Sequence, residues 1–162
     1  MEAELPADEI GELRNDIASM YDEVRGLLVR LPFDDREHVT ASGQELRTVI
    51  AQLVLSPIRD ARVARRLEDG HAGPSWSPGR LLDLITDWRL ARALSRATRR
   101  DLLAAWESGF NELFSSVNDI AEPAPEGEDG GSRRARAIAH LRGAPARVAK
   151  RVADVQRLIE AR

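Results

Sequence analysis

The chain has 162 residues, of which 43% are apolar, 31% charged and 4% aromatic, and it contains no cysteine. A chain of this size fits one domain with a sizeable core, and the lack of cysteine excludes disulfides, thiolate metal sites and thiol nucleophiles. The formal net charge of −3 gives no overall attraction to nucleic acid or to a membrane surface.

The first two helices are predicted from apolar residues that recur every three or four positions. In residues 8–31 these residues form one stripe, and Pro32 ends the helix because a residue before proline avoids helical geometry. A capping box at residues 42–45 begins the second helix. Pro57 lies inside its apolar pattern and predicts a kink, and the pattern ends at Gly70.

A loop and two further helices are predicted in the middle of the chain. Residues 70–77 are rich in glycine and proline, which is typical of a loop, and Pro78 fits the first position of a short helix. Residues 98–101 form a second capping box and begin a longer helix. One unbroken helix over residues 78–119 would be about 60 Å long, too long for a small bundle, so we expect a break near residues 95–98.

The rest of the chain is predicted to be a loop and one last helix. Residues 121–134 are acidic and glycine-rich with no large apolar side chain, which predicts a mobile loop. The last helix covers residues 135–160, where Gly143 and Pro145 predict a kink or a restart. No stretch alternates with period two. We therefore expect one all-α domain over residues 1–162, an up-and-down four-helix bundle with one extra short helix.

The charges are unevenly distributed along the chain. Residues 1–23 carry eight acidic side chains and one arginine, whereas residues 133–162 carry nine basic and two acidic side chains. The favoured interpretation is that these two ends pack as antiparallel neighbours and attract each other. A basic binding face is the alternative, although residues 121–162 contain no Phe, Tyr or Trp on which a base could stack. We expect no specific nucleic-acid partner.

The sequence gives no sign of export or membrane insertion. The amino-terminal end is acidic and lacks the basic and apolar regions of a signal peptide. The most apolar stretch is residues 49–55, far short of the roughly 20 residues that span a membrane. The sequence therefore predicts a cytoplasmic protein without a membrane partner.

Four phrases, in this order, resemble the DinB/YfiT-like superfamily of four-helix bundles. A Leu-Pro step ends the first helix at residues 31–32, and the second helix reads ELRTVIAQL at residues 45–53. A later helix reads SRATRRDLLAA at residues 95–105, and the last reads AIAHLRG at residues 137–143. The resemblance spans nearly the whole chain and implies a DinB-like fold. It also implies a chemistry, because many members resemble mycothiol- or bacillithiol-dependent transferases and isomerases with a divalent metal on three histidines.

This chain departs from that family at the metal ligands. By the resemblance, one histidine comes from the second helix, where Gln52 stands, and two come from an H-x3-H pair on the last helix. Here His140 is followed by Ala144 four residues later and by Val148 eight residues later. Alanine and valine cannot coordinate a metal, and a glutamine oxygen is a poor ligand for nickel or zinc. We therefore expect no three-histidine metal site and no cofactor.

A ligand pocket is predicted from four side chains on different helices: Gln52, Trp88, Trp106 and His140. A buried amide without a partner costs about 1–3 kcal/mol, so Gln52 and His140 could bond to each other or to a ligand. His140 also fits a remnant metal ligand, a proton donor or a packed helical histidine. Asp83 and Asp87 are four residues apart, and a solvated helix face is favoured over an acid/base pair.

Two classes of function follow from these observations. The first is a metal-free binding module that takes a small molecule or a protein partner, with a homodimer as one form. The second is an enzyme, a thiol S-transferase or isomerase with an altered metal site. No catalytic residue is identified by the sequence.

Overall fold

The computed structural model describes residues 7–31, 41–70, 78–121 and 130–161. These residues form helices and no strand, which confirms the all-α prediction. The helices of the described part are α1 (Ala7–Val29), α2 (Ala41–Val54), α3 (Ser56–Glu68), α4 (Pro78–Leu94), α5 (Arg99–Ala121), α6 (Gly130–Arg142) and α7 (Ala144–Glu160). None of them is long and apolar enough to cross a membrane. Residues 71–77 of the predicted loop, which include His71 and Trp76, lie outside the described residues.

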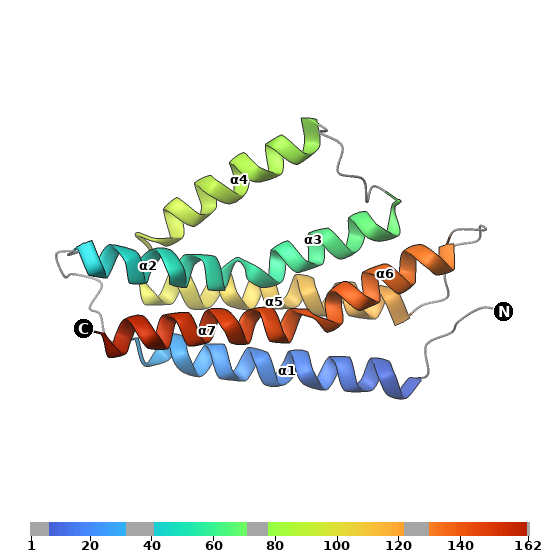
Figure 1. Ribbon diagram of the computed structural model, residues 1–162, viewed down its shortest axis with the longest axis horizontal. Coiled ribbons are helices and arrows are strands. Elements are labelled where there is room, and N and C mark those ends of the chain that lie inside the picture. The colour runs from blue at the N-terminus through green and yellow to red at the C-terminus, as the bar shows by residue number, and fades with distance from the viewer. Residues whose placement is uncertain (1–6, 32–40, 71–77, 122–129, 162) are drawn as a thin grey trace.

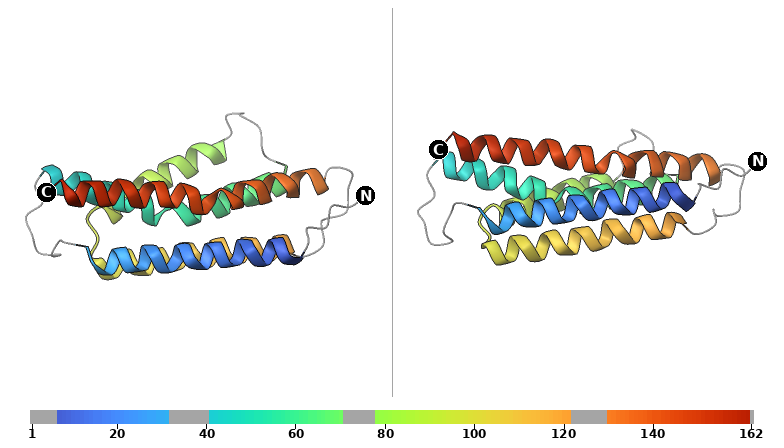
Figure 2. Two further views of the ribbon diagram at one scale, coloured as in Figure 1. Left: turned by 60° about the horizontal axis from the view of Figure 1, so that its bottom comes forward. Right: turned by 90° about the horizontal axis from the view of Figure 1, so that it is seen from below.

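Four helical rods lie side by side, and α4 contacts α2 near its carboxyl-terminal end and projects away from the rods (Figure 1, Figure 2). The rods are α1, α5, the α2–α3 pair and the α6–α7 pair, and each packs against at least two others. In Figure 1, α1 and α6–α7 run in one direction, whereas α2–α3 and α5 run in the other. The rods therefore do not alternate strictly as the up-and-down prediction requires, because α4 carries the chain back between α3 and α5.

Proline and glycine interrupt two rods where the sequence predicts it. Leu55 separates α2 from α3, and Pro57 stands in the first turn of α3. Gly143 separates α6 from α7, and Pro145 stands in the first turn of α7. Proline has no N–H and fits a first helical turn, but it cannot continue a preceding helix without a break. Both predicted kinks are confirmed.

The start of α5 is fixed by the capping box predicted at residues 98–101. The Oγ1 atom of Thr98 accepts a hydrogen bond from the Asp101 N–H (3.2 Å). In return, Asp101 Oδ2 accepts from the Thr98 hydroxyl (2.7 Å) and from the Thr98 N–H (3.2 Å). The bond from the Thr98 hydroxyl, and to a smaller extent the bond from the Thr98 N–H, lower the pKa of Asp101 because they stabilise its charged form. The predicted break before α5 is thereby confirmed.

The core of the described residues is built by the four rods. Apolar side chains from α1, α2, α3, α5, α6 and α7 form one continuous buried cluster. Its largest fully buried members are Trp106, Ile17, Leu28, Leu46, Ile50 and Leu53. Among the described residues of α4, only Leu94 is a buried apolar side chain. Most of α4 therefore lies outside the core that the four rods share.

The helix ends differ in places from those predicted. The last rod begins at Gly130, so the final part of the predicted mobile loop, residues 130–134, is helical. The first residue of that loop, Ala121, ends α5. Residues 122–129 lie outside the described residues, as does the side chain of Ser42 in the first capping box. The α2 helix begins at Ala41, one residue before the predicted cap.

Candidate functional site

Gln52 belongs to a polar network that joins α2, α3 and α4. Its Oε1 atom accepts a hydrogen bond from Arg59 Nη1 (2.5 Å). Arg59 Nε is 3.2 Å from one carboxylate oxygen of Asp87, and Arg62 Nη1 is 2.7 Å from the other. The amide oxygen of Gln52 is thus engaged by the chain's own arginine.

His140 belongs to a second network, centred on the carboxylate of Asp60. Asp60 lies in the first part of α3 and is only 7% exposed. Its Oδ1 atom is 3.0 Å from His140 Nε2 on α6 and 2.9 Å from Arg147 Nη2 on α7. Arg147 Nη2 also donates to the backbone carbonyl of His140 (2.7 Å). Asp60 therefore holds together the two segments on either side of Gly143.

The two tryptophans of the predicted pocket lie in different surroundings. Trp106 is fully buried in the core, where its Nε1–H donates to the Tyr21 carbonyl (3.3 Å) and its ring stacks on Tyr21 at 6.5 Å. Trp88 is 60% exposed on α4, and its ring lies 5.5 Å below the Arg92 guanidinium. The structure gives the four predicted pocket residues separate neighbours, and neither Gln52 nor His140 is the other's partner in the networks above.

The residues at the ligand positions that the resemblance implies do not fit a metal ion. Nowhere in the described ranges do three His, Cys, Asp or Glu side chains come together to hold one. Ala144 and Val148 are buried apolar residues without a donor atom. Arg59 beside Gln52 and Arg147 beside His140 add positive charge at the positions where a cation would have to bind. This donor set is unsuited to a divalent metal.

Sequence reasoning missed the arginines of α3 as partners of α4. Asp87 pairs with Arg59 and Arg62, and Asp83 pairs with Arg66. The two aspartates are therefore neither an acid/base pair nor a solvated face. A signal was present in the sequence, because these arginines and these aspartates each repeat every three or four residues and so mark one face of each helix.

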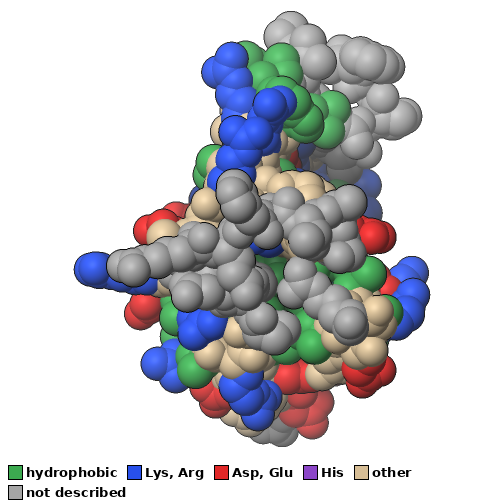
Figure 3. All heavy atoms as spheres, turned by 90° about the vertical axis from the view of Figure 1, so that its left-hand side faces the viewer, with side chains coloured by type: hydrophobic (Ala, Val, Ile, Leu, Met, Phe, Trp, Pro, Cys, Tyr) green, Lys and Arg blue, Asp and Glu red, His purple; other side chains and the backbone are tan. Residues whose placement is uncertain are grey.

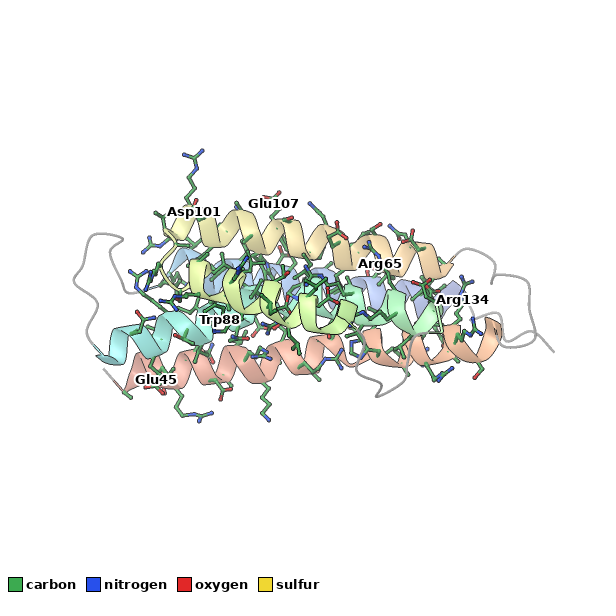
Figure 4. The ribbon with its side chains drawn as sticks, turned by 90° about the horizontal axis from the view of Figure 1, so that it is seen from above. Glu45, Arg65, Trp88, Asp101, Glu107 and Arg134 are labelled. Atoms are coloured by element: carbon green, nitrogen blue, oxygen red, sulfur yellow. The ribbon has the colours of Figure 1, made fainter. Side chains whose placement is uncertain are left out.

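The pairing of its aspartates with α3 leaves the apolar side chains of α4 in solvent. Leu82, Leu84 and Trp88 are 60–64% exposed, and Ile85 is 42% exposed. We call these four side chains the α4 face. Trp88, which was predicted to line a ligand pocket, is an exposed side chain of this face, because most of α4 projects away from the rods (Figure 1). In Figure 4, α4 lies nearest the viewer with Trp88 labelled on it.

The acidic and basic ends of the chain meet at one ion pair among the described residues. Glu9 on α1 pairs with Arg142 on α6. Other bases of the carboxyl-terminal end pair elsewhere, because Arg134 contacts Glu68 and Arg147 contacts Asp60, both on α3. The bases of the carboxyl-terminal end therefore pair with α3 as well as with α1. The predicted antiparallel packing of the two ends is wrong, because α1 and α6–α7 lie against each other and run in the same direction (Figure 1).

No protein-family model, curated protein or solved structure matches the chain. Function must therefore follow from the geometry described above.

Proposed function

We propose that this chain is a binding module, a metal-free helical bundle of DinB-like type that binds a protein partner on the α4 face. The observation that carries the proposal is the orientation of α4. This helix turns Asp83 and Asp87 toward the arginines of α3 and leaves Leu84 and Trp88 exposed. A helix in a bundle normally buries its apolar side and exposes its charged side.

The concentration of exposed apolar side chains supports this proposal. Seven large apolar side chains of the described residues are exposed, and five of them, including Leu90, lie on α4. The other two, Val29 and Val63, lie singly on α1 and α3. Single exposed apolar residues are ordinary, whereas a cluster on one element marks an interaction site. Tryptophan is also enriched among the residues that dominate protein interfaces.

The networks around Gln52 and His140 support the metal-free part of the proposal. In a DinB-like arrangement these two residues occupy or adjoin the ligand positions of the second and last helices. Here Arg59 already donates to Gln52 Oε1, and Asp60 Oδ1 already contacts His140 Nε2. These contacts weigh against a small-molecule site between Gln52 and His140 and against thiol transfer at a bound metal. The exposed surface of α4 is therefore the better candidate for a binding site.

Photo-crosslinking in the native cells tests the proposed function. A benzophenone side chain at position 84 places the reactive group on the α4 face, and one at position 107 serves as the control. Glu107 is exposed on α5, away from α4 (Figure 4). We expect a protein adduct at position 84 and none at position 107. Equal adducts at both positions, or none at position 84, would refute the proposal.

A further inference from the structure

We infer that the α4 face binds an acidic amphipathic helix of another protein. This inference rests on the proposed function and specifies the chemistry of the partner. It follows from the charges that accompany the apolar side chains of α4 and from the way α4 is attached to the bundle.

Two exposed arginines lie on the same side of α4 as its apolar residues. With about 100° between successive residues of a helix, Arg92 falls about 20° and Arg89 about 40° from the direction of Ile85. Both arginines are exposed, and the guanidinium of Arg92 lies over the ring of Trp88 at 5.5 Å. Figure 3 shows apolar and basic side chains together on the part of the molecule that projects at the top. A partner that covers Ile85 and Trp88 must therefore meet both positive charges.

The acidic residues of α4 do not neutralise these arginines. Asp83 and Asp87 are the acids of this helix, and both pair with arginines of α3. No carboxylate of the described residues pairs with Arg89 or Arg92. Covering the α4 face with an uncharged surface would remove water from the arginines without supplying new hydrogen-bond partners, and this desolvation costs free energy. A partner with carboxylates beside its apolar side chains avoids that cost and gains charge-assisted hydrogen bonds.

A second copy of this chain fits the α4 face poorly. Two α4 helices packed face to face would bring Arg89 and Arg92 of one copy against the same arginines of the other. Like charges across an interface disfavour association, and α4 carries no unpaired acid to offset them among its described side chains.

A membrane and a nucleic acid also fit less well than a protein helix. Helices that lie in a membrane surface carry their basic residues on the polar side, away from the apolar one, whereas Arg89 and Arg92 lie between the apolar residues here. Single-stranded nucleic acids bind rows of aromatic side chains, and Trp88 is the one aromatic residue in α4. Both remain as outcomes that the experiment must distinguish.

The dimensions of α4 define the partner segment. The helix has 17 residues, a length of about 25 Å, and can lie along a partner helix of four to five turns. Such a partner needs apolar residues at positions i, i+3 or i+4, and i+7 to contact Leu84 and Trp88. Glutamates flanking that stripe would reach Arg89 and Arg92.

Titration with matched model peptides tests this inference. The probe is a 21-residue helical peptide with leucines at i, i+4, i+7 and i+11 and glutamates flanking them, sized to cover α4 at about 1.5 Å per residue. Its control has lysine at every glutamate position. Isothermal titration calorimetry at low ionic strength should show the glutamate peptide binding at least tenfold more tightly than the lysine peptide. Equal binding of the two peptides, or preference for the lysine peptide, would overturn the inference.

Variants locate the binding on the α4 face. Trp88→Ala should weaken binding of the glutamate peptide at least tenfold, and Arg89→Gln with Arg92→Gln should reduce both the affinity and its dependence on salt. Val29→Ala removes an apolar side chain that is 48% exposed on α1 and should leave binding unchanged. Leu84→Ser serves as a second variant on the face, and circular dichroism verifies that each variant is folded. Loss of binding in Val29→Ala, or full binding in Trp88→Ala and Leu84→Ser, contradicts the inference.

The competing partners give distinct results. The acidic-helix inference is overturned if the glutamate peptide does not bind and one of three other partners does. These partners are vesicles of phosphatidylcholine and phosphatidylglycerol, an oligothymidylate, and a second copy of the chain in a dimer that Trp88→Ala dissociates. A protein adduct at position 84 without peptide binding would refute this inference and leave the proposed function standing. Absence of an adduct together with absence of peptide binding would refute both.

Discussion

Replacing Gly143 by alanine should change the stability of the protein in a direction set by Arg147. Gly143 joins α6 to α7 with φ −78° and ψ −11°, a right-handed helical geometry that alanine adopts without strain. Gly→Ala in such a geometry stabilises by about 0.5–1 kcal/mol because it restricts the unfolded chain. However, the added Cβ would lie 2.5 Å from Arg147 Nη1, so this side chain must move.

The cost of that movement comes from the contacts that Arg147 makes. Its Nε and Nη2 atoms bind Asp60 Oδ1 at 3.2 and 2.9 Å, and Nη2 also binds the His140 carbonyl. Hydrogen bonds to a charged group contribute about 1.5–3 kcal/mol. Because the Arg147 side chain is 42% exposed, we reduce this to about 1–2 kcal/mol for solvent screening. Gly143→Ala alone should therefore destabilise the protein by about 0.5–1 kcal/mol.

A double-mutant cycle separates the two effects. Urea unfolding followed by circular dichroism should show a midpoint lower by about 0.25–0.5 M for Gly143→Ala, given a slope of about 2 kcal/mol/M. In the Arg147→Ala background the same change should raise the midpoint, because the clashing side chain is absent. The coupling energy between the two positions should be about 1–2 kcal/mol. A stabilised Gly143→Ala single variant, or equal destabilisation in both backgrounds, would refute this reasoning.

Three further predictions concern the buried carboxylate, the α5 cap and the metal. Asp60→Asn should lower the free energy of unfolding by about 1.5–3 kcal/mol, whereas Asp154→Asn, which breaks the exposed pair with Arg157, should change it by less than about 0.5 kcal/mol in the same urea titration. Asp101 has a lowered pKa in the folded protein, so its carboxylate stabilises the fold above its unfolded pKa near 4 and loses this effect as the pH falls through the folded value. The Tm difference between wild type and Asp101→Asn should therefore be present at pH 7 and shrink as the pH is lowered below 4, and a pH-independent difference would contradict this prediction. Protein purified without a histidine tag should contain only substoichiometric nickel, zinc and iron by mass spectrometry, and one bound equivalent would disprove the metal-free proposal.

The features of the fold that the sequence predicted are those with local causes. Pro57 and Pro145 act on the helices that contain them, and Thr98 and Asp101 are three residues apart, so each signal can be recognised within one turn or two. The direction of the rods could not be recognised in this way. It depends on α4 serving as a return connection, and a helical stripe in the sequence does not indicate which neighbour it packs against.

The polar networks were harder to predict because their partners are distant in the sequence. Asp60 and His140 are 80 residues apart, and Asp87 lies 28 residues from Arg59. Gln52 and Arg59 are only seven residues apart on neighbouring helices, across the break at Leu55. The sequence showed that Gln52 and His140 needed partners if buried, but not that arginine and aspartate supplied them.

Apolar side chains lie around most of the circumference of α4, so the apolar pattern alone does not determine how this helix is turned. The magnitudes involved bear on the proposed function. The three ion pairs that join Asp83 and Asp87 to α3 are partly exposed, and such pairs each contribute about 0–1 kcal/mol. Burying the exposed part of Leu84 and Trp88, which are 63% and 60% exposed, would instead contribute about 1–2 kcal/mol for each side chain. The ion pairs therefore do not by themselves compensate for the exposed face. A partner that covers Leu84 and Trp88 while the ion pairs stay intact would recover the burial energy without turning α4, and this imbalance is the physical reason to look for such a partner at this helix.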